Sequence, residues 1–262
     1  MRPLVTFLSD FGTGDPFVGL CHLAVLAEAP DAQVVDLGHA VRPQHVAQGA
    51  ARLADAVAHT PIPATHLAVV DPGVGSARRA TVLLAGGHRL VGPDNGLLVP
   101  AAERLGGIAG AWALPIPEEA SATFHGRDVF APVAGRLAGG ALPADLGEAV
   151  APAEITRLAI PAAHVAPGSV TAPVRDIDRY GNVQLAATAT DLDGAEVGAR
   201  LQARAGQRGA RASRVRTFAD LPTGRAGVLV DSFGWVAVTV AGGSAAERLA
   251  CDLGDTVELT PA

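Results

Sequence analysis

The sequence predicts an α/β fold with two domains: an N-terminal doubly wound, mostly parallel sheet of the Rossmann-like type, and a smaller C-terminal all-β domain like a barrel. In the first half of the 262 residues, short apolar runs alternate with segments of helical periodicity, as in parallel sheets. Beyond about residue 170, short apolar runs are separated by Gly-rich turns instead. We therefore expect an N-terminal domain at 1–158, an Ala- and Pro-rich linker at 159–169 and a barrel at 170–262.

Three apolar runs in the first half have the length and composition of strands. They are Leu4–Leu8, Gln33–Leu37 and His66–Val70. One helix is expected from about Asp15 to Ala29, and another where apolar side chains recur with helical spacing. The apolar face of this second helix holds Val46, Ala50, Leu53, Ala54 and Val57. Ligands of such sheets bind beyond the carboxyl ends of the strands, which makes Asp10 and Asp71 candidate site residues.

The second half contains further strand-like runs and a cluster of arginines. The runs are Val170–Leu185, Gly227–Val240 and Thr256–Thr260. The arginines are Arg200, Arg204, Arg208, Arg211, Arg214 and Arg216. A surface that binds single-stranded nucleic acid would interleave such cations with aromatic side chains. Gly and Ala fill the intervals here, so we expect a solvated hairpin and no nucleic-acid partner.

Composition excludes several classes of chemistry. All 20 basic residues are Arg, so Schiff-base catalysis, a pyridoxal phosphate anchor and a P-loop lysine are impossible. The two cysteines are far apart and form no CxxC pair, which argues against a disulfide framework or a zinc ribbon. The histidine spacing resembles no HExxH motif, so no metal is expected. The histidines considered are His22, His39, His45, His59 and His66.

The chain shows no targeting or membrane signal. No apolar run reaches the roughly 18 residues of a membrane span, and no basic region precedes an apolar stretch at the N-terminus. The net charge of −6 also argues against a nucleic-acid partner. We therefore expect a cytoplasmic protein that acts on a small molecule.

Three clusters in the first half carry groups suited to chemistry. Asp10 precedes a Gly-rich turn and could accept hydrogen bonds from a ribose diol, or simply cap the turn. Asp71 and Arg78 flank a glycine turn, where they could form an ion pair that keeps the carboxylate ionised. The alternative is a surface turn with a solvated arginine. His125, beside Gly126, could act as a general acid or base or only begin a helix.

A fourth cluster joins Asp176–Val183 with Asp231–Trp235. Asn182, beside a glycine and Tyr180, could bind an adenine edge while the aromatic ring stacks on its face. The alternative is an ordinary hairpin with Tyr180 in the core.

Together these clusters resemble one family, the S-adenosylmethionine (SAM) hydroxide adenosyltransferases, which are relatives of the fluorinase and chlorinase. Six motifs occur in the family's order and span nearly the whole chain. They are L-S-D-F-G, V-D-P-G-V-G-S-x-R, G-P-D-N-G, F-H-G-R-D-x-F-A-P, I-D-R-Y-G-N and D-S-F-G. A set of six ordered motifs is far more specific than any one of them alone.

The resemblance implies an N-terminal α/β domain, a C-terminal β-barrel, and homotrimers whose active sites lie between the N-domain of one subunit and the C-domain of the next. The implied reaction is attack of water or hydroxide on C5′ of S-adenosyl-L-methionine, which gives adenosine and L-methionine without a cofactor. The implied catalytic set is Asp71, Arg78 and His125. The implied substrate contacts are Asp10 at the ribose and Asp178, Tyr180, Asn182, Ser232, Phe233 and Val240 around the nucleoside and methionine.

The resemblance also separates hydrolase from halogenase. The halogenases carry Tyr where this chain has Asp71 and His125, and the fluorinase has a halide-binding Ser where this chain has Gly126. Many relatives have Lys-Gly where this chain reads Cys21-His22, and Glu and Asn where it has Ala237 and Ala241. The alternatives are a halide-using relative or a non-catalytic protein that binds SAM or adenosine. A Rossmann-type oxidoreductase is disfavoured because the chain has no GxGxxG after a strand.

Overall fold

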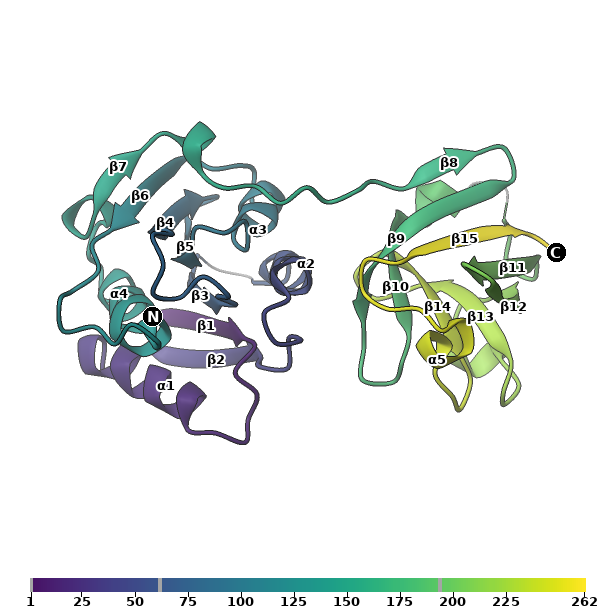
Figure 1. Cartoon of the computed structure of the whole chain (residues 1–262), viewed down its shortest axis with the longest axis horizontal. Coiled ribbons are helices and arrows are strands. Elements are labelled where there is room, and N and C mark those ends of the chain that lie inside the picture. Colours follow the sequence, from purple (N-terminus) through teal and green to yellow (C-terminus); the bar gives the residue numbers. More distant parts are fainter. Residues whose placement is uncertain (1, 61–62, 193–194) are drawn as a thin grey trace. The chain divides into compact units, whose positions relative to one another are not determined.

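The computed structural model describes residues 2–60, 63–192 and 195–262. The chain divides into two compact units, residues 1–158 and 159–262, each with its own hydrophobic core (Figure 1). None of the helices in the described part of the chain is long and apolar enough to cross a membrane.

A seven-stranded sheet forms the centre of the first unit, with the order β2-β1-β3-β5-β4-β6-β7. Its parallel part consists of β1 (Leu4–Ser9), β2 (Gln33–Gly38), β3 (Thr65–Val69) and β5 (His88–Pro93). Its antiparallel edge consists of β4 (Ala80–Ala85), β6 (Gly110–Leu114) and β7 (Glu148–Val150). The three strands predicted from the sequence are present, in adjacent positions.

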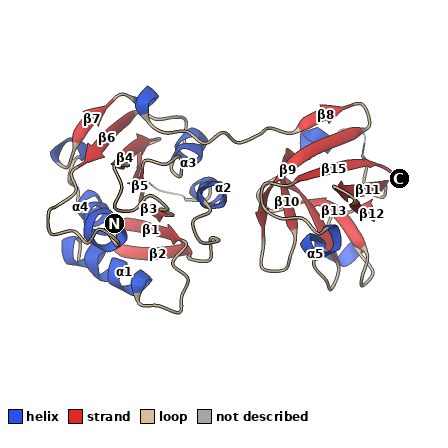
Figure 2. Cartoon of the chain, viewed as in Figure 1, coloured by secondary structure: helices blue, strands red, loops and turns tan. Residues whose placement is uncertain are grey.

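Helices cover both faces of this sheet, which confirms the predicted doubly wound fold (Figure 2). One face packs against α1 (Phe17–Glu28) and α4 (Ala131–Ala138), and the other against α2 (Val46–Val57) and α3 (Val99–Arg104). In β1, Phe7 points into the first core and Leu8 into the second. Successive side chains of a strand face opposite sides, so a strand covered on both faces is apolar throughout.

The sequence patterns did not reveal the strands that follow β3, and the first two of these form the β4–β5 hairpin. Gly86 and Gly87 connect the two strands with φ values of 54° and 82°. Two consecutive positive φ values are what a tight hairpin turn between twisted strands requires. Because of this reversal, β4 lies antiparallel between β5 and β6, and the sheet is parallel only over β2-β1-β3-β5.

The second unit is a closed barrel of seven strands, as predicted. Around the barrel the order is β9-β10-β14-β13-β12-β11-β15 and back to β9. The strands are β9 (Ser169–Ile177), β10 (Val183–Thr188), β11 (Arg200–Ala205), β12 (Arg208–Arg214), β13 (Ala226–Val230), β14 (Trp235–Val240) and β15 (Thr256–Pro261). A short helix, α5 (Ala245–Leu249), packs on it.

The arginine-rich segment is the expected hairpin, formed by β11 and β12. Leu201 and Ala203 point into the barrel core while Arg204 and Arg211 are exposed, because side chains alternate along a strand. Most of the arginines therefore lie on the solvated side of the hairpin, while the half-buried Arg214 donates to the carbonyls of Val215 and Val228.

The segment expected to be a linker differs from the prediction. Residues 164–166 form β8 (His164–Ala166), which pairs antiparallel with the first residues of β9. Gly168, with φ at 76°, makes the turn. Of the predicted linker, residues 159–163 lack regular structure. The remainder does not, because the Pro167-Gly168 pair makes a hairpin turn where the composition indicated only a break.

Candidate active site

Asp71 and Arg78 lie at the two ends of a glycine turn that follows β3. Within the turn, the Val74 amide donates to the Asp71 carbonyl (3.3 Å) and the Ser76 hydroxyl donates to the Gly73 carbonyl (2.6 Å). These bonds reverse the chain, so Arg78 Nε donates to Asp71 Oδ1 at 3.0 Å, and its Nη2 donates to Oδ2. The two side chains are only 10% and 6% exposed. The predicted ion pair is present, and the alternative of a solvated arginine is wrong.

His125 completes this network from a segment 47 residues further along the chain. Arg78 Nη2 donates to His125 Nδ1 at 2.8 Å. A guanidinium has no lone pair to offer, so Nδ1 must be the unprotonated nitrogen, and the neutral ring carries its proton on Nε2. Burial, followed by the Arg78 charge, lowers the pKa of His125. The geometry therefore fixes a neutral imidazole whose Nε2–H is a donor.

The segment after His125 is a π-helical turn, Gly126–Phe130, that runs directly into α4. Such turns within helices are frequent at functional sites because they alter the direction of a few side chains. Here Phe130 packs beneath the network, with the Arg78 guanidinium 5.1 Å from its ring centre. The alternative reading of His125 as a helix-start residue also holds, since it is the residue before this turn.

Gly75 brings the Asp71–Arg78 turn against the loop before His125. Its φ is 76°, and a Cβ added there would lie 2.5 Å from the Ala122 carbonyl oxygen. We expect Gly75→Ala to lower kcat at least tenfold and stability by about 2 kcal/mol, because both the backbone angle and the contact become unfavourable. Thermal unfolding and steady-state kinetics measure both effects. Gly19→Ala on α1, where an added Cβ meets nothing within 4 Å, is the control, and unchanged kinetics in Gly75→Ala would contradict the expectation.

Asp10 follows β1 at the same end of the sheet. Its Oδ2 accepts a hydrogen bond from the Gln44 amide at 2.7 Å, so it joins two loops that are 34 residues apart. Burial raises the pKa of Asp10, backbone hydrogen bonds oppose this, and the negative charge of Asp71 adds to the increase. Asp10 and Asp71 are thus electrostatically coupled, and Asp10 does more than cap its own turn.

Three aromatic rings lie beside this network, and no sequence pattern indicated them. Phe11 follows Asp10, Phe17 begins α1 and Phe124 precedes His125. Their ring centres are 5.3–6.1 Å apart in tilted edge contacts. A Cβ at Gly126 would lie 3.0 Å from the Phe11 ring, so glycine allows this close packing. The three rings form an apolar cluster next to Asp10 and His125.

In the barrel unit, Asp178 organises the loop between β9 and β10. Its Oδ1 accepts from the amides of Tyr180 (2.8 Å) and Asn182 (2.9 Å), and its Oδ2 accepts from Asn182 Nδ2 (2.7 Å). Thr239 Oγ1 donates to Asn182 Oδ1 at 2.5 Å. The loop leaves Tyr180 71% exposed. The alternative that placed Tyr180 in the core is therefore wrong.

The loop between β13 and β14 is built in the same way, around a carboxylate that we did not select from the sequence. Asp231 Oδ1 accepts from the amides of Phe233 (2.9 Å) and Trp235 (3.0 Å), and Gln184 Nε2 donates to its Oδ2. Ser232 and Phe233 are exposed at the tip of the loop. The repeated pattern of an Asp two residues before an aromatic residue was the available signal for Asp231.

The structure brings some predicted site residues together and leaves others in a different setting. Asp10, Asp71, Arg78 and His125 belong to one end of the sheet in the first unit. The predicted residues of the barrel form two loops in the second unit, except that the Val240 side chain is buried in the barrel core and its carbonyl accepts from the Gly243 amide at 3.1 Å.

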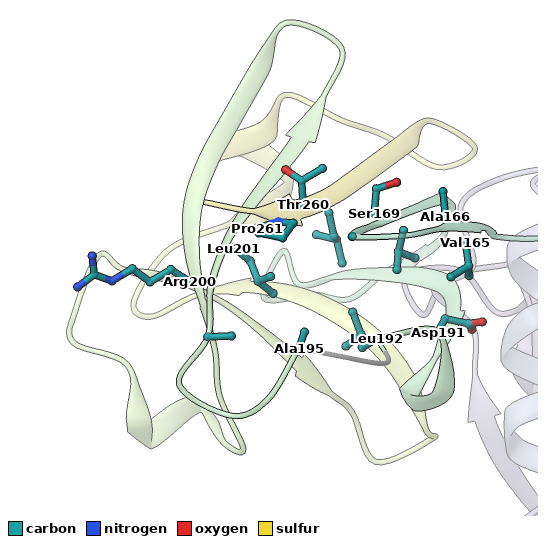
Figure 3. Close-up of a pocket in the computed structure, with 14 residues that line it drawn as sticks. Val165, Ala166, Ser169, Asp191, Leu192, Ala195, Arg200, Leu201, Thr260 and Pro261 are labelled. Atoms are coloured by element: carbon teal, nitrogen blue, oxygen red, sulfur yellow. The ribbon is translucent and has the colours of Figure 1, made fainter.

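A separate pocket of about 260 Å³ lies on the barrel unit (Figure 3). The β8–β9 hairpin, the segment around Leu192 and the last residues of β15 line it. None of the predicted site residues is among its lining residues.

Both halves of the chain match domains of one known family. The SAM hydroxide adenosyltransferase N-terminal domain matches residues 5–147, and the C-terminal domain of the same family matches residues 172–258. The chain belongs to the SAM hydroxide adenosyltransferase family. Both structural units of the chain thus correspond to domains of this family.

Named members of the family align over the full chain. An (R)-S-adenosyl-L-methionine hydrolase from Salinispora arenicola is 48% identical over 262 residues, covering 98% of each chain. One from Thermus thermophilus is 39% identical over 275 residues, covering 99% of this chain and all of the relative. A fluorinase from an Actinoplanes species is more distant, at 28% identity over 78% of each chain.

Two solved structures have the same fold. An uncharacterized conserved protein from Thermotoga maritima superposes with a TM-score of 0.91 at 30% identity, covering 98% of this chain and 99% of the other. A conserved hypothetical protein from Thermus thermophilus superposes with a TM-score of 0.79 at 41% identity, covering 99% and 100%.

Proposed function

We propose that this chain hydrolyses S-adenosyl-L-methionine at C5′, giving adenosine and L-methionine. The observation that carries the proposal is the continuous Asp71–Arg78–His125 network at the carboxyl end of the sheet. Because its relatives are named (R)-S-adenosyl-L-methionine hydrolases, we also propose that the substrate has the R configuration at sulfur.

The chemistry needs a nucleophile more than an acid. A water oxygen forms a bond to C5′ while the C5′–S bond breaks. The electron pair of the C5′–S bond goes to sulfur, so methionine leaves as a neutral thioether. One proton is released from the water. The sulfonium already activates the leaving group, so we propose that the reaction uses no cofactor.

The network suits the activation of one water molecule. Asp71 keeps lone pairs beyond those used by Arg78 and accepts a hydrogen bond from the water, while His125 Nε2–H donates one to the water oxygen. Arg78 donates hydrogen bonds to both Asp71 and His125 and so holds both partners in place. Positioning a water for in-line attack removes up to roughly 7–11 kcal/mol of the activation barrier. A positioned base contributes a further factor of about 10²–10⁴.

The remaining predicted residues bind the substrate in this proposal. Asp10 accepts from the ribose hydroxyls, and the exposed rings of Tyr180 and Phe233 and the polar groups of Asp178, Asn182 and Ser232 contact the nucleoside and methionine. We propose that the chain forms a homotrimer in which the barrel of one subunit supplies these groups to the sheet of its neighbour. The two sets of groups belong to separate compact units, which is compatible with such sharing.

The test is turnover of the two SAM epimers, supplied separately, in ¹⁸O-labelled water that contains chloride. We expect the label in the 5′-hydroxyl of adenosine, equimolar L-methionine, and faster turnover of the R epimer. Formation of 5′-chloroadenosine would overturn the proposal in favour of a halogenase. Binding by calorimetry without any turnover would identify a non-catalytic SAM or adenosine receptor instead.

A further inference from the structure

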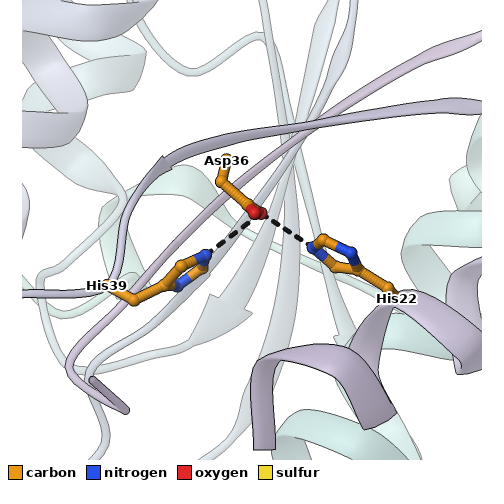
Figure 4. Close-up of side chains that lie close together, drawn as sticks. All are labelled: His22, Asp36 and His39. Carbon is orange, nitrogen blue, oxygen red and sulfur yellow. Dashed lines mark hydrogen bonds and ion pairs between the residues drawn. The ribbon is translucent and has the colours of Figure 1, made fainter. Parts of the chain in front are cut away.

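Three side chains of types that can bind metal ions lie close together in the first unit, outside the Asp71–Arg78–His125 network. His22 lies on α1, Asp36 on β2, and His39 follows directly after β2. Both imidazoles point at one carboxylate oxygen: His22 Nε2 is 2.7 Å and His39 Nε2 is 3.0 Å from Asp36 Oδ1 (Figure 4). The spacing of these residues in the sequence gave no sign of the cluster.

His39 is held in the orientation of a metal ligand. Its Nδ1 lies 2.8 Å from the Ser9 hydroxyl, and its ring packs edge-on against Phe7, with 4.7 Å between ring centres. Its Nε2 is buried and makes no geometrically acceptable hydrogen bond to any residue that the structure describes. In metal-bound histidines the ring nitrogen that does not bind the metal is held by a polar group, as His39 Nδ1 is by Ser9, and the other nitrogen is left for the ion.

We propose that His22, Asp36 and His39 bind one divalent ion of the Zn²⁺ class. Two imidazoles and one carboxylate are the ligand set of three-ligand zinc sites, where water fills the fourth position. Imidazole also favours Zn²⁺ and its late first-row neighbours over Mg²⁺ or Ca²⁺. The three ligand atoms lie within 4.8 Å of one another.

Binding the ion requires only small movements. Tetrahedral ligation with bonds of about 2.0–2.1 Å places ligand atoms roughly 3.3 Å apart, so the ion would enter between the imidazoles and the carboxylate. The side chains of His22 and Asp36 are 29% and 40% exposed, which gives both room to adjust and leaves a side open to a water ligand. The buried His39 is the fixed member of the set.

An ion at this position would connect α1, β2 and the loop that carries Asp10. Ser9, which orients His39, is adjacent to Asp10, and the Gly12 amide donates to the His39 carbonyl at 2.7 Å. The bound ion would therefore stabilise the end of the sheet that carries Asp10, where we propose that the substrate binds. A ligand that binds only the folded state at about 100 times its Kd raises Tm by roughly 5–10 °C for a domain of this size.

The test uses the full chain without a purification tag, stripped with a chelator and titrated with ZnCl₂ by calorimetry. We expect one ion per chain, a higher Tm, and a visible absorption band when Co²⁺ replaces Zn²⁺. His22→Gln and Asp36→Asn should each weaken Zn²⁺ binding at least tenfold and remove the Co²⁺ band. His164→Gln, which removes an exposed histidine of β8, is the matched control and should bind as the unmodified chain does.

Two results would overturn the proposal. One is the absence of stoichiometric Zn²⁺ binding, which would leave the cluster as an ion-pair network. The other is binding of full strength in both His22→Gln and Asp36→Asn, which would place the ion elsewhere. Both substitutions are on partly exposed side chains, and circular dichroism of each variant verifies that the fold is retained. The outcome does not depend on whether the chain hydrolyses SAM.

Discussion

Asp71→Asn is expected to reduce kcat for SAM hydrolysis by about 10²–10⁴-fold, the usual contribution of a positioned general base. The amide keeps the size of the side chain but loses the charge that pairs with Arg78. It therefore removes the acceptor proposed for the water, and also leaves a buried guanidinium without its counter-charge. Steady-state kinetics on the R epimer of SAM measure the loss.

A second Asp–Arg pair, in which the aspartate is buried and the arginine is partly exposed, provides the control for stability. Asp94 accepts from Arg79 Nε at 2.8 Å and from the Thr156 amide at 2.8 Å. Its side chain is buried as deeply as that of Asp71. Asp94→Asn should lower Tm comparably and leave kcat within about twofold. If both variants lost activity equally, the Asp71 effect would reflect folding and its proposed role would be wrong.

Asp71→Asn also tests whether an active site is shared between two subunits. Asn182→Ala should also be inactive, because it removes a proposed substrate contact from the barrel. When the two inactive proteins are dissociated and reassembled together, some sites draw Asp71 from one subunit and Asn182 from another, so activity should partly return. No recovery in mixed oligomers would contradict the proposed interface site.

Acid is expected to destabilise the first unit through a buried histidine pair. Thr6 Oγ1 lies 2.7 Å from His66 Nδ1, and His66 Nε2 lies 3.0 Å from His88 Nδ1. The Ala64 amide also donates to His88 Nδ1 at 3.2 Å. His88 Nδ1 must therefore be an acceptor, so the His88 ring is neutral. Burial, and then the repulsion that a protonated His66 would meet from a proton on His88, lower the pKa of His66 to about 3.

The sign follows from proton uptake. The unfolded chain protonates His66 near its ordinary pKa of about 6.5, whereas the folded chain resists protonation until about pH 3. The stabilisation is complete above pH 6.5 and is lost as the pH falls through the interval from 6.5 to 3. The loss approaches 1.4 kcal/mol per pH unit, with an upper limit of roughly 5 kcal/mol.

Urea unfolding between pH 7 and pH 4 measures this effect. The slope of unfolding free energy against pH should be shallower in His66→Asn by close to one proton, and unchanged in the exposed control His164→Gln. Trp112 on β6 reports the first unit if Trp235 in the barrel is replaced by Phe. Equal slopes in His66→Asn and the unmodified chain would show that His66 does not titrate between the two states.

Much of the fold was predictable because its signals are local. β1, β3 and α2 were visible from apolar runs and helical spacing, and the arginine hairpin from its composition. The β4–β5 hairpin was missed because a strand buried on both faces and a short buried helix give similar apolar patterns. The β8 strand was missed because its three residues are stabilised by pairing with β9 and not by any periodicity of their own.

In the candidate site too, local contacts were predictable and contacts between distant segments were not. The contact of Asp71 with Arg78 spans one glycine turn, and its spacing predicted it. The approach of His125 to Arg78 was implied only by the resemblance to a family. The Phe11–Phe17–Phe124 cluster and the Asp10–Gln44 hydrogen bond had no sequence signal, because each joins segments whose distance depends on the order of strands in the sheet.

The fold class, the family and the residues of the proposed catalytic set could be recognised from the sequence, because periodicity, turns and ordered motifs involve neighbouring positions. The hydrogen bond from Arg78 that makes His125 Nδ1 an acceptor, and the approach of His22, Asp36 and His39 to one another, depend on the packing of distant segments. Parallel strands bring together residues that are far apart in the chain, and protonation and ion binding depend on those contacts.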